Sequence, residues 1–298
     1  MSILADVNKE YSKDAKLKKD DIESLRMWAE KQPHLPNISE LQYILFLQSC
    51  YYSNEQAKQA IENYFTLRSV CKDIFCNGKS NDRGIQMALD VGLISFLPKP
   101  APNGNKIVFM RLLDTNTDKY IFLDQTRLFD MVVTLVMHLN GTNEGINMIM
   151  DMDGATLGHF LKFNPSVAKK YLFYLQEALP IRLKEIHLIT VPSWIDKLMT
   201  LLKPLLKKEL LDMIHIHSNL DSFHKVLPKE YLPKDYGGNG SEAVTTLAEQ
   251  MRSLVENNSE FFQYQQQQVT DESKRIEKSK DYSEILGLEG TFKKLDVD

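Results

Sequence analysis

The chain has 298 residues, of which 43% are apolar and 26% are charged, as is typical of a globular protein large enough to bury a sizeable core. Its net charge of −4 argues against a nucleic-acid partner, because phosphate binding requires a basic surface. The N-terminus lacks an apolar signal segment, and Cys50, Cys71 and Cys76 lack a metal-type spacing. These features indicate a cytoplasmic protein with neither a bound metal nor a cofactor.

The first third of the chain is predicted to be helical. Residues 20–31 and 39–49 carry apolar side chains at helical spacing, and Pro33 ends the first of these segments. Ser53 and Gln56 match a capping box ahead of a further apolar stripe. We therefore expect a small helical bundle and assign a helical N-terminal subdomain to residues 1–95.

Beyond residue 105, short apolar runs alternate with segments of helical spacing. The runs at 107–113, 145–151, 186–191 and 213–217 are predicted to be strands, and residues 123–139 and 165–177 are predicted to be helices. Strands separated by helices of crossover length predict a mixed, largely parallel sheet covered by helices, which is an α/β domain. We assign this domain to residues 96–265, with a last helix at 241–268 and a polar tail at 266–298.

The segment 192–211 carries a broad apolar stripe. At about 100° per residue its leucines lie opposite Asp196, Lys197 and Lys203. Pro204 removes a backbone donor inside this pattern and predicts a kink between two helical pieces. The pattern alone favours a helix that faces the core over a movable cover.

No complete catalytic constellation is evident. Asp151, Asp153 and His159 follow a predicted strand, where acid–base chemistry is one interpretation, but such short polar side chains more often bind their own backbone. His215 and His217 would face the same side of a strand, as metal ligands do, yet no third ligand is identifiable and structural histidines are favoured. Neither a nucleophile elbow nor a phosphate-binding loop occurs. We do not expect an enzyme.

The strand at 145–151 would place Ile146, Met148 and Met150 on one face. Methionine side chains suit an irregular apolar cavity, and they fill solid cores equally well. The residues alone favour a solid core and leave a cavity as the alternative.

Five ordered segments resemble the CRAL-TRIO family, which includes the cellular retinaldehyde-binding protein and the α-tocopherol transfer protein. The segments are 145–154 with His159, 179–189, 202–206, 215–217 and 232–238. Residues 46–57 resemble the helical N-terminal part of the same family, and the tail at 290–295 resembles insect members.

This resemblance implies a hydrophobic lipid pocket under a helical gate. The pocket walls would be Phe129, Val133, Ile146, Met148, Met150, Leu157, Leu161, Tyr174, Leu175, Leu179 and Ile186. The segment 192–211 would be the gate, with Trp194, Ile195, Leu198, Leu201, Leu202 and Leu205 as its apolar residues.

The resemblance also implies a basic cleft beside the gate for lipid headgroups. Arg182 and Lys184 match two positions of this cleft, and Lys207 and Lys208 are candidate substitutes for the others. The remaining family positions hold Cys50, Glu209 and Met213, none of which is basic, so headgroup-triggered release is left open.

These observations lead to an expected function as a carrier. The protein would bind a small hydrophobic ligand, such as a tocopherol, a retinoid, a carotenoid or a similar lipid, and transfer it between membranes. It would be cytoplasmic and peripheral to membranes, with a transient membrane surface, including phosphoinositides, as its other partner. The alternative is a phosphoinositide-responsive membrane adaptor without a transfer role.

Overall fold

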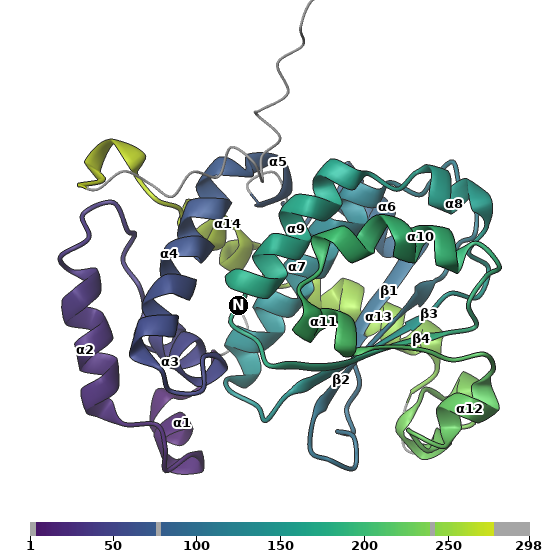
Figure 1. Cartoon of the computed structure of the whole chain (residues 1–298), viewed down its shortest axis with the longest axis horizontal. Helices are drawn as coiled ribbons and strands as arrows, with labels where there is room; N and C mark the ends of the chain where they lie inside the picture. Colours follow the sequence, from purple (N-terminus) through teal and green to yellow (C-terminus); the bar gives the residue numbers. More distant parts are fainter. Residues whose placement is uncertain (1–3, 76–78, 239–241, 277–298) are drawn as a thin grey trace, which may run out of the picture.

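A computed structural model describes residues 4–75, 79–238 and 242–276 (Figure 1). Helices of the N-terminal part lie beside an α/β domain. They are α1 (Val7–Lys13), α2 (Lys19–Ala29), α3 (Glu40–Ser49), α4 (Asn54–Val70), α5 (Lys72–Phe75) and α6 (Arg83–Val91). Ser39 and Gln42 form a full capping box at the start of α3, and the Ser53 side chain accepts a hydrogen bond from the Gln56 N–H at the start of α4. The predicted helical character of this region is confirmed.

One five-stranded sheet forms the centre of the α/β domain, with the order β1-β2-β3-β4-β5. The strands are β1 (Gly92–Phe96), β2 (Lys106–Leu112), β3 (Ile146–Asp151), β4 (Leu183–Ile189) and β5 (Ile214–Ile216). β1 is antiparallel to β2, and the other pairs are parallel. The predicted mixed, largely parallel sheet is therefore confirmed.

The first strand was not expected from the sequence. It follows α6 without an intervening turn. In the sequence, its five residues therefore look like a continuation of the apolar pattern of that helix. The expected domain boundary at residues 95 and 96 consequently falls inside β1, which pairs with β2 along its whole length.

Helices that connect the parallel strands cover one face of the sheet (Figure 1). They are α7 (Phe122–Asn140), α8 (Leu157–Leu161), α9 (Pro165–Glu177), α10 (Ile195–Leu202) and α11 (Lys208–Asp212). Pro204 lies in a 3-10 turn, Lys203–Leu205, that separates α10 from α11, so the predicted interruption is present.

The other face of the sheet is covered by α12 (Leu220–His224) and α13 (Val244–Glu256), with 3-10 turns at Lys229–Tyr231 and Lys234–Tyr236. The chain then continues through α14 (Ser259–Gln267) to a 3-10 turn at Glu272–Lys274. The single helix expected at 241–268 is thus two helices within the described residues. They are separated at Asn257 and Asn258, because asparagine is a poor helix former and Asn258 has a non-helical backbone.

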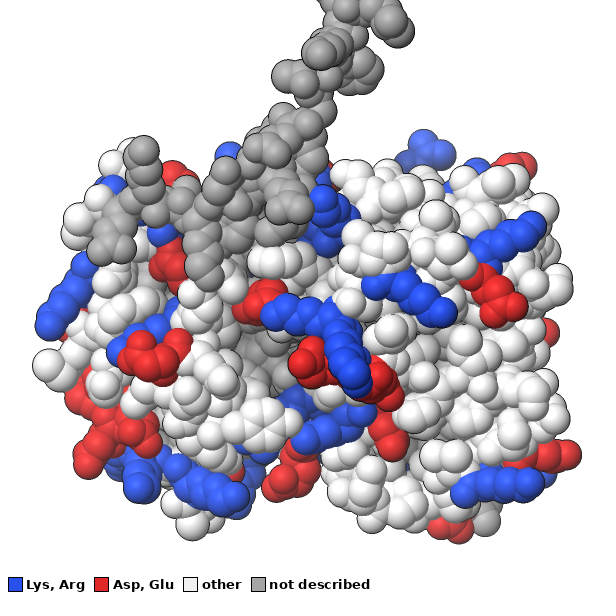
Figure 2. Space-filling model, in the orientation of Figure 1, with Lys and Arg blue, Asp and Glu red and all other residues white. Residues whose placement is uncertain are grey.

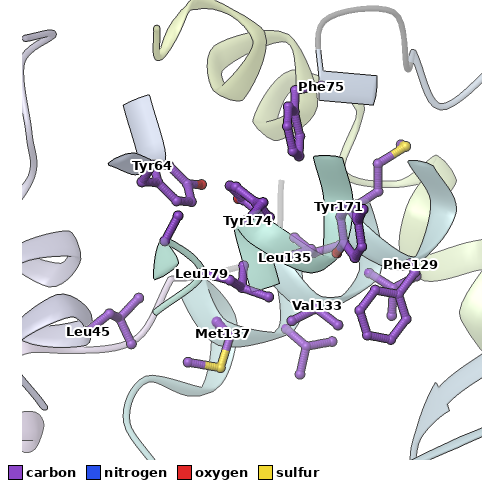
Figure 3. Close-up of a cluster of buried hydrophobic side chains, with 14 of the residues drawn as sticks. Leu45, Tyr64, Phe75, Phe129, Val133, Leu135, Met137, Tyr171, Tyr174 and Leu179 are labelled. Carbon is purple, nitrogen blue, oxygen red and sulfur yellow. The ribbon is translucent and has the colours of Figure 1, made fainter. Parts of the chain in front are cut away.

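Two apolar cores lie on the two faces of the sheet. The larger one joins the N-terminal helices to α7, α9 and one sheet face. Figure 3 shows its middle, where Tyr174 of α9 lies between Tyr64 of α4 and Phe75 of α5, with ring centroids 5.6 and 4.4 Å from those of the two partners. The N-terminal helices and the α/β domain therefore share one core.

Candidate lipid-binding cavity

An apolar cavity of about 370 Å³ lies between the sheet and the helices that connect its parallel strands. This volume is within the range of ligand pockets, roughly 300–1,000 Å³. All five strands contribute lining residues, and α8, α9, α10 and α11 form much of the opposite wall. The surface inside the cavity is almost entirely apolar, so it suits a hydrophobic molecule.

The structure places some of the expected residues on this cavity. From the expected walls, Met148, Met150, Leu175 and Ile186 line it. From the expected gate, Trp194, Leu198 and Leu202 line it. The start of α10 and one of its faces therefore close one side of the cavity, and Leu206 and Leu210 continue that wall into α11.

Two other expected wall residues and one expected gate residue are exposed instead. Leu157 and Leu161 of α8 are 50% and 75% exposed, and Leu201 of α10 is 47% exposed. The α8 side chains that line the cavity are His159 and Phe160. A capping box between Thr156 and His159 sets the orientation of this five-residue helix, and such a short apolar pattern does not reveal it.

The remaining expected residues are not among those that line the cavity. Phe129, Val133, Tyr174 and Leu179 belong to the core shared with the N-terminal helices, as Figure 3 shows. Ile146 and Ile195 are also buried in this core. Leu205 lies in the 3-10 turn after α10, where its carbonyl accepts a hydrogen bond from Gln176 Nε2. Helices α7 and α9 carry apolar residues on several faces, so spacing alone does not show which face meets the cavity.

Several lining residues were not identified from the sequence. Ile94 lies on the unexpected strand β1, Tyr120 lies two residues before α7, and Phe122 is the first residue of that helix. Tyr171 of α9 also lines the cavity, one turn before Leu175. The apolar run at 91–97 was the available signal for β1, since it continues past the end of the α6 pattern.

The four candidate headgroup-binding cations all have partners within the protein. Arg182 Nε donates to the Gln48 carbonyl at 2.8 Å, and its guanidinium lies 4.3 Å from the centroid of the Tyr51 ring. Lys184 Nζ donates to the Tyr51 hydroxyl at 2.8 Å. Lys207 pairs with Glu177 and Lys208 with Asp212, and Figure 2 shows the mixed charges over α11.

The candidate acid–base residues have structural contacts. Asp151 Oδ1 accepts a hydrogen bond from the Asp153 N–H, so this carboxylate holds its own turn. Its other oxygen accepts a hydrogen bond from the Tyr236 hydroxyl. The Thr156 N–H donates to His159 Nδ1 at 3.1 Å, and burial lowers the pKa of this imidazole.

The candidate metal-binding histidines belong to a polar chain on the far face of the sheet. His187 Nδ1 lies 3.1 Å from His217 Nε2, and His187 Nε2 lies 3.3 Å from a Glu185 oxygen. The His215 ring stacks on that of His187 with centroids 5.3 Å apart. Among the residues that the structure describes, no group of three or more His, Cys, Asp or Glu side chains is arranged to hold a metal ion.

No helix in the described ranges is both long and apolar enough to cross a bilayer. Cys50 and Cys71 are free thiols, whereas Cys76 and the 290–295 tail lie outside the described residues.

Comparisons with known proteins identify two regions of the chain. Residues 91–238 match the family model of the CRAL/TRIO domain, and residues 14–84 match that of the Pinta-like, UBA domain. The chain therefore belongs to the CRAL-TRIO domain family.

Among its curated relatives are the Homo sapiens and Mus musculus proteins named alpha-tocopherol transfer protein-like. Each is 28% identical over 229 residues, which is 76% of this chain and 66% of the relative. Clavesin-1 of Rattus norvegicus is 29% identical over 197 residues, which is 65% of this chain and 55% of clavesin-1. The chain thus spans less than two thirds of the length of these relatives. The crystal structure of Sfh5 aligns with a TM-score of 0.46 and 13% identity, covering 70% of this chain and 74% of that one.

Proposed function

We propose that this protein is a non-catalytic carrier that takes up a small hydrophobic molecule in the cavity and transfers it between membranes. The observation that supports this function best is the apolar cavity itself, which the sheet and the helices α8–α11 enclose. Burying an apolar ligand there would be favourable by roughly 25 cal/mol per Å² of surface removed from water, before the costs of binding are subtracted. The names of the tocopherol-transfer-like relatives agree with this proposal.

In this proposal α10 is the movable cover. Leu198 and Leu202 face the cavity, whereas Leu201, on the same helix, is 47% exposed. A helix with apolar side chains on both sides could close the cavity and also lie against a membrane surface, where its outer leucine is tolerated. The carrier would act as a peripheral protein of the cytoplasm.

The adaptor function is less well supported by the geometry. Each of Arg182, Lys184, Lys207 and Lys208 is held by a neighbouring group of the protein. Several converging donors would be needed to grip a phosphoinositide headgroup, and each of these cations would first have to exchange its present partner.

The two sides of α10 provide a matched test. Leu198→Asp places a carboxylate in the apolar cavity, at a desolvation cost that should abolish ligand uptake. Leu201→Asp makes the same change on the exposed side and should leave uptake intact. Native mass spectrometry of protein incubated with retinol, α-tocopherol or β-carotene measures the bound fraction. Absence of all three from the unmodified protein, or equal uptake by the two variants, would contradict the proposal.

A further inference from the structure

The segment that contains α10 and α11 is attached at its two ends to neighbouring strands of the sheet. It begins after β4 and ends at β5, a strand of three residues at the edge of the sheet. Two hydrogen bonds hold β5 to β4 at its ends. The Ile186 N–H donates to the Met213 carbonyl at 2.8 Å, and the His217 N–H donates to the Leu188 carbonyl at 2.9 Å. The pairing of β4 with β5 is therefore one of the two anchors of the cover.

Three imidazole rings lie across this pairing on the far face of the sheet. His187 of β4 is in register with His215 of β5, and the two rings stack. The ring of His217, directly after β5, has its centroid 5.2 Å from that of His187. His187 and His217 are 2% and 8% exposed, and both rings contact Phe223 of α12, the helix drawn on the side of the sheet away from α10 in Figure 1. The strand pairing thus brings three titratable side chains together.

The contacts of His187 determine which of its nitrogens carries a proton. Its Nε2 lies 3.3 Å from Glu185 Oε2, and an ionised carboxylate only accepts, so Nε2 is the protonated nitrogen of the neutral ring. Nδ1 then has the lone pair and accepts a hydrogen bond from the Nε2–H of His217 at 3.1 Å. Asn147 Nδ2 donates to the same Glu185 oxygen at 2.8 Å. This chain of hydrogen bonds therefore joins β5 to β4 and β3 while the two rings are neutral.

Protonation disrupts this chain of hydrogen bonds. A proton added to His187 Nδ1 faces the Nε2–H of His217, and protonation of both rings brings two cations into contact. Burial lowers the pKa of both imidazoles below the ordinary value of 6.5. If β5 leaves β4, the two rings meet water and regain that ordinary value. Proton binding therefore favours the separated strands as the pH falls below about 6.5.

The titratable groups packed around this pair come from three elements. On β4, the Glu185 carboxylate stabilises the charged form of His187 through its hydrogen bond and its charge. On β5, the His215 ring disfavours the charged form of both imidazoles. Helix α12 contributes His224, whose ring centroid lies 5.9 Å from that of Phe223. Glu185 thus opposes acid-induced separation of the strands, and the crowding of histidines favours it.

We propose that this histidine cluster is an acid-sensitive anchor of the cover, and that its protonation releases β5 from β4 and opens the cavity. The route from the anchor to the cavity is short, because Leu210 of α11 and Ile214 of β5 both line the cavity. Release of β5 therefore displaces part of the cavity wall. The consequence for a bound ligand rests on the proposed carrier function, whereas the release of the strand does not.

Hydrogen–deuterium exchange of the full-length protein tests the release of β5 without any ligand. After correction for the intrinsic effect of pH on exchange, the protection of residues 208–218 should fall at least tenfold between pH 7.5 and 5.5. The protection of α3, which contains no histidine, should stay within twofold and serves as the internal control. Unchanged protection of residues 208–218, or an equal loss in α3, would overturn the proposal, because the second result would indicate loosening of the whole fold.

Two variants should change this acid response in opposite directions. His217→Gln keeps a donor for His187 Nδ1 and cannot be protonated, so the loss of protection should shrink to less than threefold. Glu185→Gln keeps the hydrogen bonds and removes the charge that stabilises protonated His187, so the loss should become larger. His34→Gln, at a buried histidine beside the Glu62 carboxylate of α4, is the matched control and should respond as the unmodified protein does. Equal responses of all the variants would overturn the role of the histidine cluster.

Protein loaded with α-tocopherol tests the consequence for the cavity. Gel filtration should show that the bound fraction falls by more than half between pH 7.5 and 5.5 in the unmodified protein and is retained in His217→Gln. Full retention at pH 5.5 in a protein whose β5 is released would overturn the link between the anchor and the cavity. If α-tocopherol, retinol and β-carotene all fail to bind at pH 7.5, the proposed carrier function is contradicted, and the exchange measurements decide the anchor by themselves.

Discussion

Arg68 of α4 and Asp130 of α7 form an ion pair at 3.1 Å in the core that the N-terminal helices share with the α/β domain. Their side chains are 4% and 6% exposed, and Arg68 Nη1 also donates to the Tyr174 hydroxyl at 3.3 Å. Burial raises the pKa of the Asp130 carboxyl, and the Arg68 charge opposes this shift. The pair thus links three helices at the boundary between the two parts of the chain.

Removing one member of this pair should be costly. Asp130→Ala leaves the Arg68 charge buried without its carboxylate, which typically costs about 3–5 kcal/mol of unfolding free energy. Urea denaturation followed by circular dichroism measures the loss. The double variant Arg68→Met, Asp130→Leu replaces the pair by apolar side chains and should be more stable than the single variant. Equal stability of the two variants would show that the uncompensated charge is not the cause.

More of the fold than of the candidate site could be predicted from the sequence. Repeated alternation of strands and helices is visible in the sequence, and it sets the parallel order of β2 to β5. The identity of the residues that line the cavity depends instead on the rotational orientation of each helix about its own axis. Leu157 and Leu161 lie on a helix of five residues, too short for periodicity to orient it. Helix α9 contacts both the N-terminal helices and the cavity. Only tertiary packing shows that its Tyr174 side chain packs against the N-terminal helices.

His138 should make stability depend on pH. Burial lowers the pKa of this imidazole from 6.5 to about 4, while its Nδ1–H donates to the Thr134 carbonyl. As the pH falls, His138 is therefore protonated in the unfolded chain at a higher pH than in the folded protein. Stability is expected to decrease from about pH 6.5 downward, by roughly 3 kcal/mol in total by pH 4, at about 1.4 kcal/mol per pKa unit.

The variant His138→Phe isolates this contribution. Its ring can still pack against Phe261, whose centroid lies 5.1 Å from that of His138. Urea unfolding of both proteins at pH 7.5, 6.0 and 5.0 should show a shallower acid loss in the variant. Both proteins contain the other buried histidines with lowered pKa values, so the contributions of these residues to the acid loss cancel in the comparison. They are His159, His187 and His217. Parallel losses in the two proteins would remove His138 as a source of the pH dependence.

Tyr51 should limit the affinity for anionic membranes. Its ring lies against the Arg182 guanidinium, and its hydroxyl accepts a hydrogen bond from Lys184. Tyr51→Ala releases both cations from this partner, so flotation with vesicles that contain phosphatidylinositol 4,5-bisphosphate should increase and should weaken again at high salt. Tyr264→Ala, at another exposed tyrosine, is the control. Unchanged flotation of Tyr51→Ala would show that the cleft does not bind headgroups even when uncovered.

The exposed leucines of α8 should act in transfer rather than in ligand binding. Leu157 and Leu161 lie on a helix that borders the cavity, and uncharged surface predominates around α8 and α10 in Figure 2. In the double variant Leu157→Glu, Leu161→Glu, the free energy of unfolding should change by less than about 1 kcal/mol, because both positions are exposed. Retinol loading should also be retained, since neither side chain lines the cavity.

Transfer of retinol from the loaded protein to neutral vesicles should nevertheless slow at least tenfold, because two carboxylates replace apolar side chains that would enter the bilayer interface. Fluorescence of retinol in acceptor vesicles measures the rate. Leu4→Glu, which changes an exposed leucine far along the chain from α8, should transfer at the unmodified rate. A normal transfer rate in the α8 variant would place the membrane contact on another surface, whereas a loss of loading would mean that α8 shapes the cavity through its outer face as well.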